Sequence, residues 1–117
     1  MASYNKVILI GNMTRDPELT RTANGHDFCK FSIACNHRYK TESGELREEP
    51  VFLDCKCFGL LAVSIHQHFR KGKAILVEGR LVNDKWTDKE TGKEQSRVRV
   101  LCEHYRFVGS KDDAKES

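Results

Sequence analysis

Eight consecutive residues, 51–58, alternate between two kinds of side chain, and no other feature of the sequence constrains the fold as tightly. One set comprises Val51, Leu53, Cys55 and Cys57, and the other comprises Phe52, Asp54, Lys56 and Phe58. Because a repeat of two residues is that of a β-strand, each set occupies one face of a strand. The first face is suited to a protein core. The second is unusual for a plain solvent face, because two aromatic rings flank two charges.

Strand patterns recur on both sides of this segment. Apolar or alternating residues predict further strands over 6–10, 30–36, 73–80 and 97–105. Gly79 lies inside one apolar run and indicates a bulge or barrel corner, beyond which the strand continues. The last strand is expected to direct three side chains inward and two outward, respectively Val98, Val100 and Cys102, and Arg97 and Arg99.

Segments with turn chemistry separate these strands. Residues 38–50 are polar and charged, and they are predicted to form a long exposed hairpin loop. The segments Arg15–Glu18 and Asn24-Gly25 bracket either a loop or the start of a second strand. Thr91-Gly92 turns the chain before the last strand.

One segment has helical rather than strand spacing. Leu61, Ile65 and Phe69 predict a short helix over residues 60–70, which Lys71-Gly72 ends. The order of elements is therefore three strands, one helix and two strands. It predicts an all-β fold, a five-stranded OB-fold Greek-key barrel with one short helix between strands 3 and 4. This domain would occupy residues 1–109, followed by a short polar tail, 110–117, that we expect to be disordered.

The composition limits the function further. A chain of 117 residues suits one domain with a modest core, and its net charge of +3 does not by itself indicate nucleic-acid binding. No apolar run is long enough to span a membrane, and the N-terminal residues lack the apolar stretch of a signal peptide. We therefore expect a cytoplasmic protein without membrane contact. The five cysteines are odd in number and irregularly spaced, so we expect reduced, buried thiols.

Several residues have the chemistry for binding a single-stranded nucleic acid, which needs aromatic faces for the bases and cations for the phosphates. The exposed aromatic candidates are Tyr39, Phe52, Phe58 and Trp86, and the accompanying cations are Lys56, Lys85, Arg97 and Arg99. Phe52 and Phe58 would lie roughly 20 Å apart on one strand face, which is room for several bases. The alternative is that these two rings belong to a second core or a subunit interface, as aromatic residues often do.

Seven segments together resemble a known family. They are, in order, Lys6–Asn12, Arg15–Leu19, Phe31–Ala34, Cys57–Gly59, Arg70–Gly72, Val77–Gly79 and Lys85–Asp88. They resemble the bacterial single-stranded DNA-binding proteins over residues 5 to about 108. The resemblance implies an OB-fold homotetramer that wraps, coats and protects single-stranded DNA during replication, recombination and repair. It also implies that the first strand pairs with its copy across a two-fold axis.

The resemblance assigns roles to individual residues. The stacking positions of the family fall on Tyr39, Phe52, Phe58 and Trp86, and its basic positions fall on Lys71 and Lys85. The family usually has tryptophan at the first two positions, so we expect weaker stacking there. Members of the family often have a lysine two residues after the Phe58 position, where this sequence has Leu60, so we expect that contact to be absent. The sequence also lacks the acidic, Phe-tipped peptide that docks replication and repair enzymes in the family. Either the sequence is shortened, or it is that of a natural member without this tail, from a plasmid or phage, and we expect no recruitment through such a peptide.

Three other kinds of function compete with this interpretation. A metal site would use Cys55-x-Cys57, His66-x-His68 and Cys102-x-His104, but the spacing favours buried thiols, and we expect no metal or cofactor. An enzyme would need a nucleophile, a base and an orienting group, and no motif brings these together, so we expect no catalytic residues. An RNA-binding or primosome-assembly module of the same fold remains an alternative, because stacking tolerates many bases and backbones.

Overall fold

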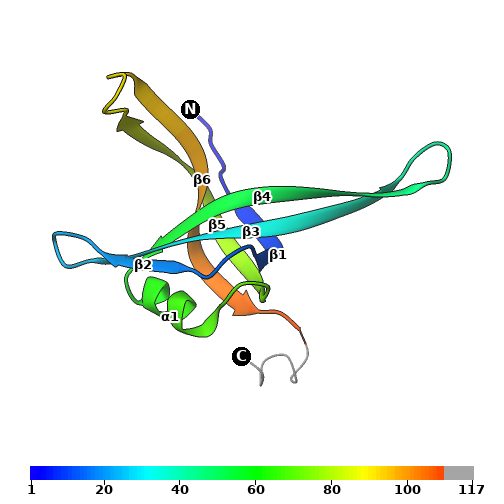
Figure 1. Cartoon of the computed structure of the whole chain (residues 1–117), viewed down its shortest axis with the longest axis horizontal. Helices are drawn as coiled ribbons and strands as arrows, with labels where there is room; N and C mark the ends of the chain where they lie inside the picture. The colour runs from blue at the N-terminus through cyan, green and yellow to red at the C-terminus, as the bar shows by residue number, and fades with distance from the viewer. Residues whose placement is uncertain (110–117) are drawn as a thin grey trace.

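Six strands and one helix form within residues 1–109, which are the residues that the computed structural model describes (Figure 1). The elements are β1 (Val7–Met13), β2 (Glu18–Arg21), β3 (Asp27–Lys40), β4 (Leu46–Phe58), α1 (Leu60–His68), β5 (Ala74–Thr87) and β6 (Glu94–Phe107). The predicted tail, 110–117, lies outside the described residues. Most residues are therefore in strands, as predicted.

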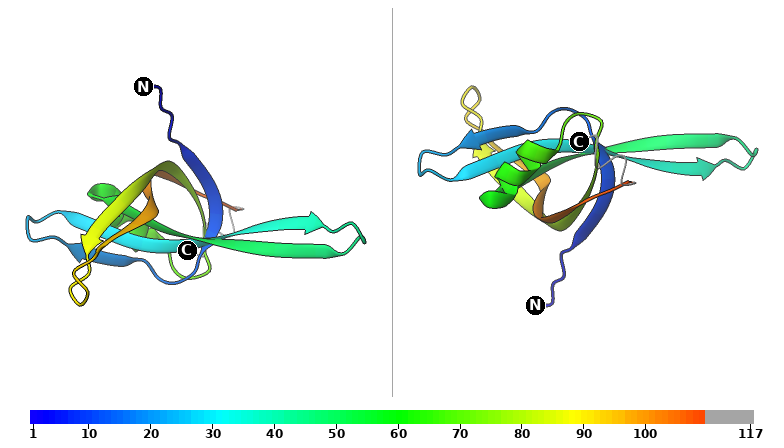
Figure 2. Two further views of the ribbon diagram at one scale, coloured as in Figure 1. Left: turned by 90° about the horizontal axis from the view of Figure 1, so that it is seen from above. Right: turned by 90° about the horizontal axis from the view of Figure 1, so that it is seen from below.

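Five of the strands close into a barrel. The sheet runs in the order β1-β5-β6-β4-β3-β2, and β1 also pairs with β3 through Asn12 and Met13, which closes the ring of β1, β5, β6, β4 and β3. All neighbours are antiparallel except β4 and β6, which are parallel. Figure 2 shows β1, β5 and β6 curving around the interior. The predicted five-stranded barrel with one helix is thus confirmed. The remaining strand, β2, is short and pairs with β3. The sequence allowed either a loop or a strand in this segment.

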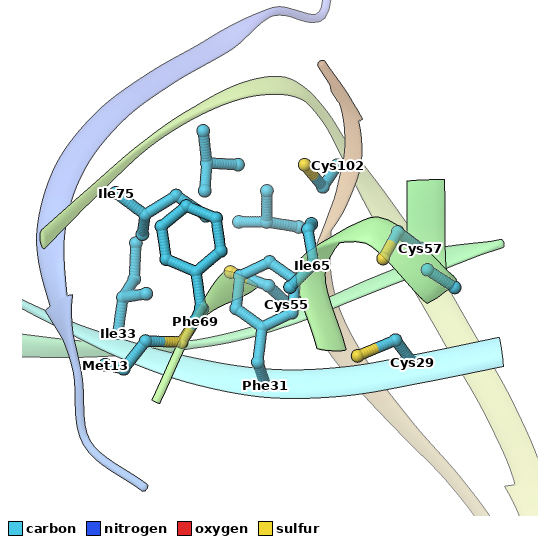
Figure 3. Packing of buried hydrophobic residues seen from close by; sticks show 13 residues of the cluster. Met13, Cys29, Phe31, Ile33, Cys55, Cys57, Ile65, Phe69, Ile75 and Cys102 are labelled. Carbon is cyan, nitrogen blue, oxygen red and sulfur yellow. The ribbon is translucent and has the colours of Figure 1, made fainter. Parts of the chain in front are cut away.

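The core lies inside this barrel and under α1. Its largest fully buried side chains include Phe31, Ile33, Ile65, Phe69 and Ile75 (Figure 3). Phe31 and Ile33 come from the inward face of β3, and Ile65 comes from the inward side of α1. Four of the five cysteines, namely Cys29, Cys55, Cys57 and Cys102, fill the remaining space and are buried. The inward face of residues 51–58 therefore supplies thiols to the core, as the alternation predicted.

Gly79 bends β5 so that the barrel can close. The register between β5 and β6 shifts at Glu78 and Gly79, which marks a β-bulge. A Cβ atom at Gly79 would lie 1.9 Å from the carbonyl oxygen of Leu101, so no larger residue fits there. Beyond the bulge β5 continues to Thr87, and β5 and β6 together extend past the barrel as a twisted hairpin (Figure 1).

The prediction of a long loop over residues 38–50 was wrong. Strands β3 and β4 stay paired from Phe28 opposite Phe58 out to Lys40 opposite Leu46, so only residues 41–45 turn the chain. Both faces of this hairpin are exposed beyond Asn36, which explains why its polar sequence resembles a loop while its backbone forms a ladder. We call residues 36–50 the arm, which projects from the barrel in Figure 1.

Several other boundaries and orientations also differ from the predictions. Strand β1 continues through Gly11 to Met13, α1 ends at His68 rather than at residue 70, and β6 covers 94–107. Val51 and Val98, which were expected to face a core, are 50% and 62% exposed. The reason is that β4 and β6 pair only at positions 55–56 and 100–101, so both strands diverge before they reach this contact.

Candidate nucleic-acid interface

The outward side of β4 carries two exposed aromatic rings. Phe52 is 66% exposed and Phe58 is 48% exposed, so neither belongs to a second core within this chain. Phe58 packs against Phe28, its partner across β3, with 5.1 Å between the ring centroids. One face of the Phe58 ring is therefore covered by Phe28, whereas the Phe52 ring is more exposed to solvent.

Lys56 lies between these rings and is held by two kinds of contact. Its Nζ lies 5.8 Å from the centre of the Phe58 ring and makes a hydrogen-bonded ion pair with Asp84 of β5. The second carboxylate oxygen of Asp84 lies 3.5 Å from Nε of Arg99 on β6. One carboxylate thus ties together cations from β4 and β6. All three side chains are mostly shielded from solvent, being between 17% and 23% exposed.

A second ion pair joins β4 and β6 near the point where the strands diverge. Arg97 donates a hydrogen bond of 3.1 Å to Asp54 Oδ2, across the space between the two strands. Beside this pair is an open hollow of about 230 Å³, which residues of β4, β5 and β6 line, among them Phe52, Leu81 and Val98. The hollow combines apolar walls with cations, which suits a base and its adjoining phosphate.

Trp86 extends the same surface along β5. It is 45% exposed, and it lies opposite Gln95, two residues along from Asp84, which lies opposite Arg97. Because alternate residues of a strand share a face, Trp86 and Asp84 point to the same side. We call this surface the outer face, made of Phe52, Asp54, Lys56, Phe58, Asp84, Trp86, Arg97 and Arg99.

Three predicted site residues lie elsewhere. Tyr39 is on the arm, on the opposite face of the β3–β4 hairpin from Phe52, where it is 36% exposed and stacks on His37. Lys85 alternates with Trp86 and therefore points to the other side of the β5–β6 hairpin. Lys71 lies in the turn after α1, where its backbone N–H donates to Asp16. The outer face thus gathers six of the nine predicted residues.

Sequence reasoning did not name four residues of this region as site residues, although it placed Asp54 on the outward face of 51–58. Phe28 supports Phe58, Lys30 lies opposite Lys56 with its Nζ 5.5 Å from the Phe28 ring, and Asp54 and Asp84 hold the cations. A signal for two of them is present, because Phe28-Cys29-Lys30 is the reverse of Lys56-Cys57-Phe58 and the alternation begins at Phe28. No such signal in the sequence indicates that Asp54 pairs with Arg97 or that Asp84 pairs with Lys56.

The cysteines and histidines are not arranged as a metal site. Among residues 1–109 no group of three histidine, cysteine or acidic side chains is placed to hold a metal ion. Burial raises the pKa of the Cys102 thiol to about 12, and burial also raises the pKa of the Cys55 thiol above its ordinary value. Thiols of this kind remain protonated near neutral pH, and metal binding requires the thiolate. Cys55 and Cys102 therefore pack as small apolar residues.

Within the described part of the chain, no helix is both long and apolar enough to cross a membrane. Helix α1, the one helix among residues 1–109, has nine residues.

Comparison with known proteins places the geometry in a family. The model of the Single-strand binding protein family matches residues 4–108. Curated relatives include the single-stranded DNA-binding protein of Wolinella succinogenes, 43% identical over 92% of this chain and 66% of the relative. Another is that of Helicobacter hepaticus, 40% identical over 97% of this chain and also 66% of the relative. This chain thus spans just under two thirds of the length of either relative.

Solved structures agree with this placement. The single-stranded DNA binding protein from Thermus aquaticus is 30% identical and superposes with a TM-score of 0.79, covering 92% of this chain and 52% of that chain. A Plasmodium falciparum SSB, solved in complex with ssDNA, is 22% identical, with a TM-score of 0.80 over 93% of this chain and 98% of that chain, and supports the fold. By its sequence over residues 4–108 and by its barrel, this chain belongs to the single-strand binding protein family.

Proposed function

We propose that this chain binds single-stranded DNA without regard to sequence, by stacking bases on exposed aromatic rings and pairing phosphates with nearby cations. The observation that carries the proposal is the outer face, where Phe52, Phe58 and Trp86 are all between 45% and 66% exposed beside Lys56, Arg97 and Arg99. Rings of this kind accept any base, because every base has a π-face.

The remaining predicted residues have secondary roles in this proposal. Tyr39 would stack on a base where the strand passes the arm, and Lys71 and Lys85 would contact phosphates on either side of the outer face. Family membership supports the proposed binding of single-stranded DNA, since curated relatives carry the name single-stranded DNA-binding protein. Coating and protecting single strands during replication, recombination and repair would follow from sequence-independent binding. Such a role needs no catalytic group, and it would place the protein in the cytoplasm, at the nucleoid.

We also propose assembly into a homotetramer. Between Val7 and Gly11, strand β1 pairs with β5 on one edge, and no strand of the described residues pairs with its other edge. Ile8 and Ile10 are 61% and 56% exposed on the outward side of this strand. An open strand edge next to exposed isoleucines favours pairing with a second copy. Light scattering at micromolar protein should give about four times the chain mass of 13.5 kDa, whereas the mass of one chain would contradict assembly.

The decisive test of the function is a competition experiment. A fluorescently labelled oligo-dT is bound to the protein, and unlabelled single-stranded DNA of mixed sequence, single-stranded RNA and duplex DNA are added as competitors. The unlabelled single-stranded DNA should compete far better than the duplex, whose bases are not free to stack. Equal competition by the duplex would contradict the proposal. Better competition by the RNA would favour an RNA-binding or primosome-assembly module of the same fold.

A further inference from the structure

The outer face contains two carboxylates, although carboxylates repel the phosphates that this surface would bind. Asp84 contacts Lys56 and Arg99, and Asp54 contacts Arg97, so each cation of the outer face already has a negative partner. The face therefore carries three positive and two negative charges, and its net charge is much smaller than its cations suggest.

The shielding of the contacts that Asp84 makes with Lys56 and Arg99 separates them from ordinary surface ion pairs, whereas Arg97 and Asp54 are 59% and 40% exposed. The side chains of Lys56 and Asp84 are 17% and 23% exposed, whereas those of Arg38 and Glu48 on the arm are 80% and 50% exposed. An exposed pair contributes little and exchanges readily with dissolved ions, while shielding strengthens the attraction within a pair. Lys56 is therefore held by Asp84 rather than left free for an incoming phosphate.

The crowding of cations explains why the carboxylates are useful in the free protein. Lys30 and Lys56 lie directly opposite each other on β3 and β4, an arrangement in which like charges repel. Arg99 lies within reach of the same carboxylate as Lys56. Asp84 offsets this repulsion from a third strand, β5, and so stabilises the face while no DNA is bound.

The contact between Arg99 and Asp84 is the weaker part of this arrangement. Arg99 Nε is buried, lies 3.5 Å from Asp84 Oδ2, and makes no hydrogen bond to any described residue. A buried donor without an acceptor is unfavourable. Arg99 would therefore gain a hydrogen bond by turning to a phosphate oxygen, and that phosphate would then compete with Asp84 for Arg99.

We infer that Asp84 is an internal competitor of DNA phosphate: it holds Lys56 and Arg99 in the free protein and so lowers both the affinity for single-stranded DNA and its salt dependence. This inference rests on the proposed function. When a cation leaves Asp84 for a phosphate, one counterion leaves the DNA, but the freed carboxylate attracts another from solution. The net release of ions is then close to zero, and these two cations contribute little to the salt dependence.

The test compares Asp84→Asn with the wild type. The amide keeps the size of the side chain but removes its charge, so Lys56 and Arg99 become available to phosphates. Each cation that neutralises a phosphate of a single strand adds about 0.7 to the steepness of log affinity against log salt, so the variant should gain about 1.4. Its advantage over the wild type should therefore fall about sevenfold as salt rises from about 50 to about 200 mM.

Two control variants separate this effect from others. Asp84→Glu keeps the carboxylate and should bind with the wild-type salt dependence. Asp27→Asn removes a carboxylate with the same side-chain exposure of 23%, paired with Arg21 at 3.3 Å. Residue 27 alternates with Phe28, the partner of Phe58, so its side chain lies on the other side of β3 from the outer face. Asp27→Asn changes the total charge by the same amount as Asp84→Asn, and it should leave the salt dependence unchanged.

The outcomes divide clearly. A steeper dependence and tighter low-salt binding in Asp84→Asn alone would support the inference. An unchanged slope, weaker binding by the folded variant, or the same gain in Asp27→Asn would overturn it. If Asp84→Asn does not fold, then Asp84→Ser, which also removes the carboxylate, decides in its place with the same expected gain of about 1.4. If the wild type itself does not bind single-stranded DNA, the proposed function fails, and the inference fails with it.

Discussion

The outer face and the arm each carry three basic side chains, but the two regions differ in the number of carboxylates around them and in the solvent exposure of the ion pairs. On the outer face Lys56, Arg97 and Arg99 meet two carboxylates, and the closest pair is largely shielded from solvent. The arm places Arg38, Lys40 and Arg47 among four glutamates, in pairs that are at least half exposed. Similar numbers of cations thus give a net positive, aromatic surface in one region and a slightly negative one in the other.

The difference shows that position, rather than the count of charges, determines which region is suited to DNA. The outer face joins three strands of the barrel, so its rings and cations have fixed neighbours. The arm is a two-stranded hairpin with both sides in solvent, and its one exposed aromatic ring, Tyr39, already stacks on His37. We therefore expect changes on the outer face to weaken binding more than changes on the arm.

The largest expected effect concerns the backbone that supports each region. Gly79→Ala places a methyl group against the carbonyl of Leu101 and should cost about 3 kcal/mol of unfolding free energy, because the clash is with backbone. Gly44→Ala, in the turn of the arm, meets no atom within 4 Å and should cost only about 1 kcal/mol, for a positive φ of 87°. Urea unfolding of both variants measures the difference, and equal costs would contradict the role given to the bulge.

Next in size are the aromatic rings of the outer face. Trp86→Ala and Phe58→Ala should each weaken binding of single-stranded DNA per chain by about 5- to 150-fold, which corresponds to the roughly 1–3 kcal/mol of a stacked base. Fluorescence anisotropy of a labelled oligo-dT measures the loss, provided that both variants remain folded and keep the assembly state of the wild type. Wild-type affinity in folded Trp86→Ala would place the β5–β6 hairpin away from the DNA.

Phe58 tests a second point in the same experiment. Its ring packs on Phe28, so Phe58→Ala combines a lost stacking surface with lost packing. If this variant unfolds while Trp86→Ala does not, the role of Phe58 in supporting the barrel outweighs its role in binding.

A smaller effect is expected for the aromatic ring of the arm. Tyr39 lies on the other side of the β3–β4 hairpin from Phe52, and its ring is already in contact with His37. Tyr39→Ala should therefore weaken binding by less than about fivefold, below the range for a stacked base. The same anisotropy titration checks this value. A loss as large as that of Trp86→Ala would show that the arm and the outer face contribute equally.

The smallest effects are expected for single cations outside the outer face. Lys85 has no acidic partner among the described residues, so Lys85→Ala should reduce the steepness of the salt dependence by about 0.7. Arg38 is paired with Glu48 at 2.8 Å, so Arg38→Ala should reduce it by less. Titrations at several salt concentrations give both slopes, and the reverse order would mean that the arm lies closer to the phosphates.

Much of the barrel could be predicted from the sequence, because a period of two depends only on neighbouring residues. The alternation over residues 51–58 placed Cys55 and Cys57 in the core and Phe52 and Phe58 outside it, as observed. The same reasoning failed at Val98, which is 62% exposed, because periodicity does not say where a strand leaves its neighbour. It failed for the arm as well, since a ladder with two solvated faces has no apolar stripe.

The outer face could be predicted only in part. Its rings and cations stand out locally, because aromatic residues alternate with charges. The ion pairs do not, because Lys56 meets Asp84 across 28 positions of sequence and Arg97 meets Asp54 across 43. Such pairs depend on the closure of the barrel, which brings β4, β5 and β6 together, and no local pattern contains that information.

The most direct test of the account uses Trp86, the only tryptophan of the chain. A single titration with oligo-dT follows DNA binding by anisotropy of a label on the DNA and follows Trp86 by its intrinsic fluorescence. If the outer face is the binding surface, the tryptophan fluorescence should fall in parallel with the anisotropy signal and saturate at the same ratio of DNA to protein, because a base stacks on the indole. Binding seen by anisotropy with unchanged tryptophan fluorescence would contradict the account.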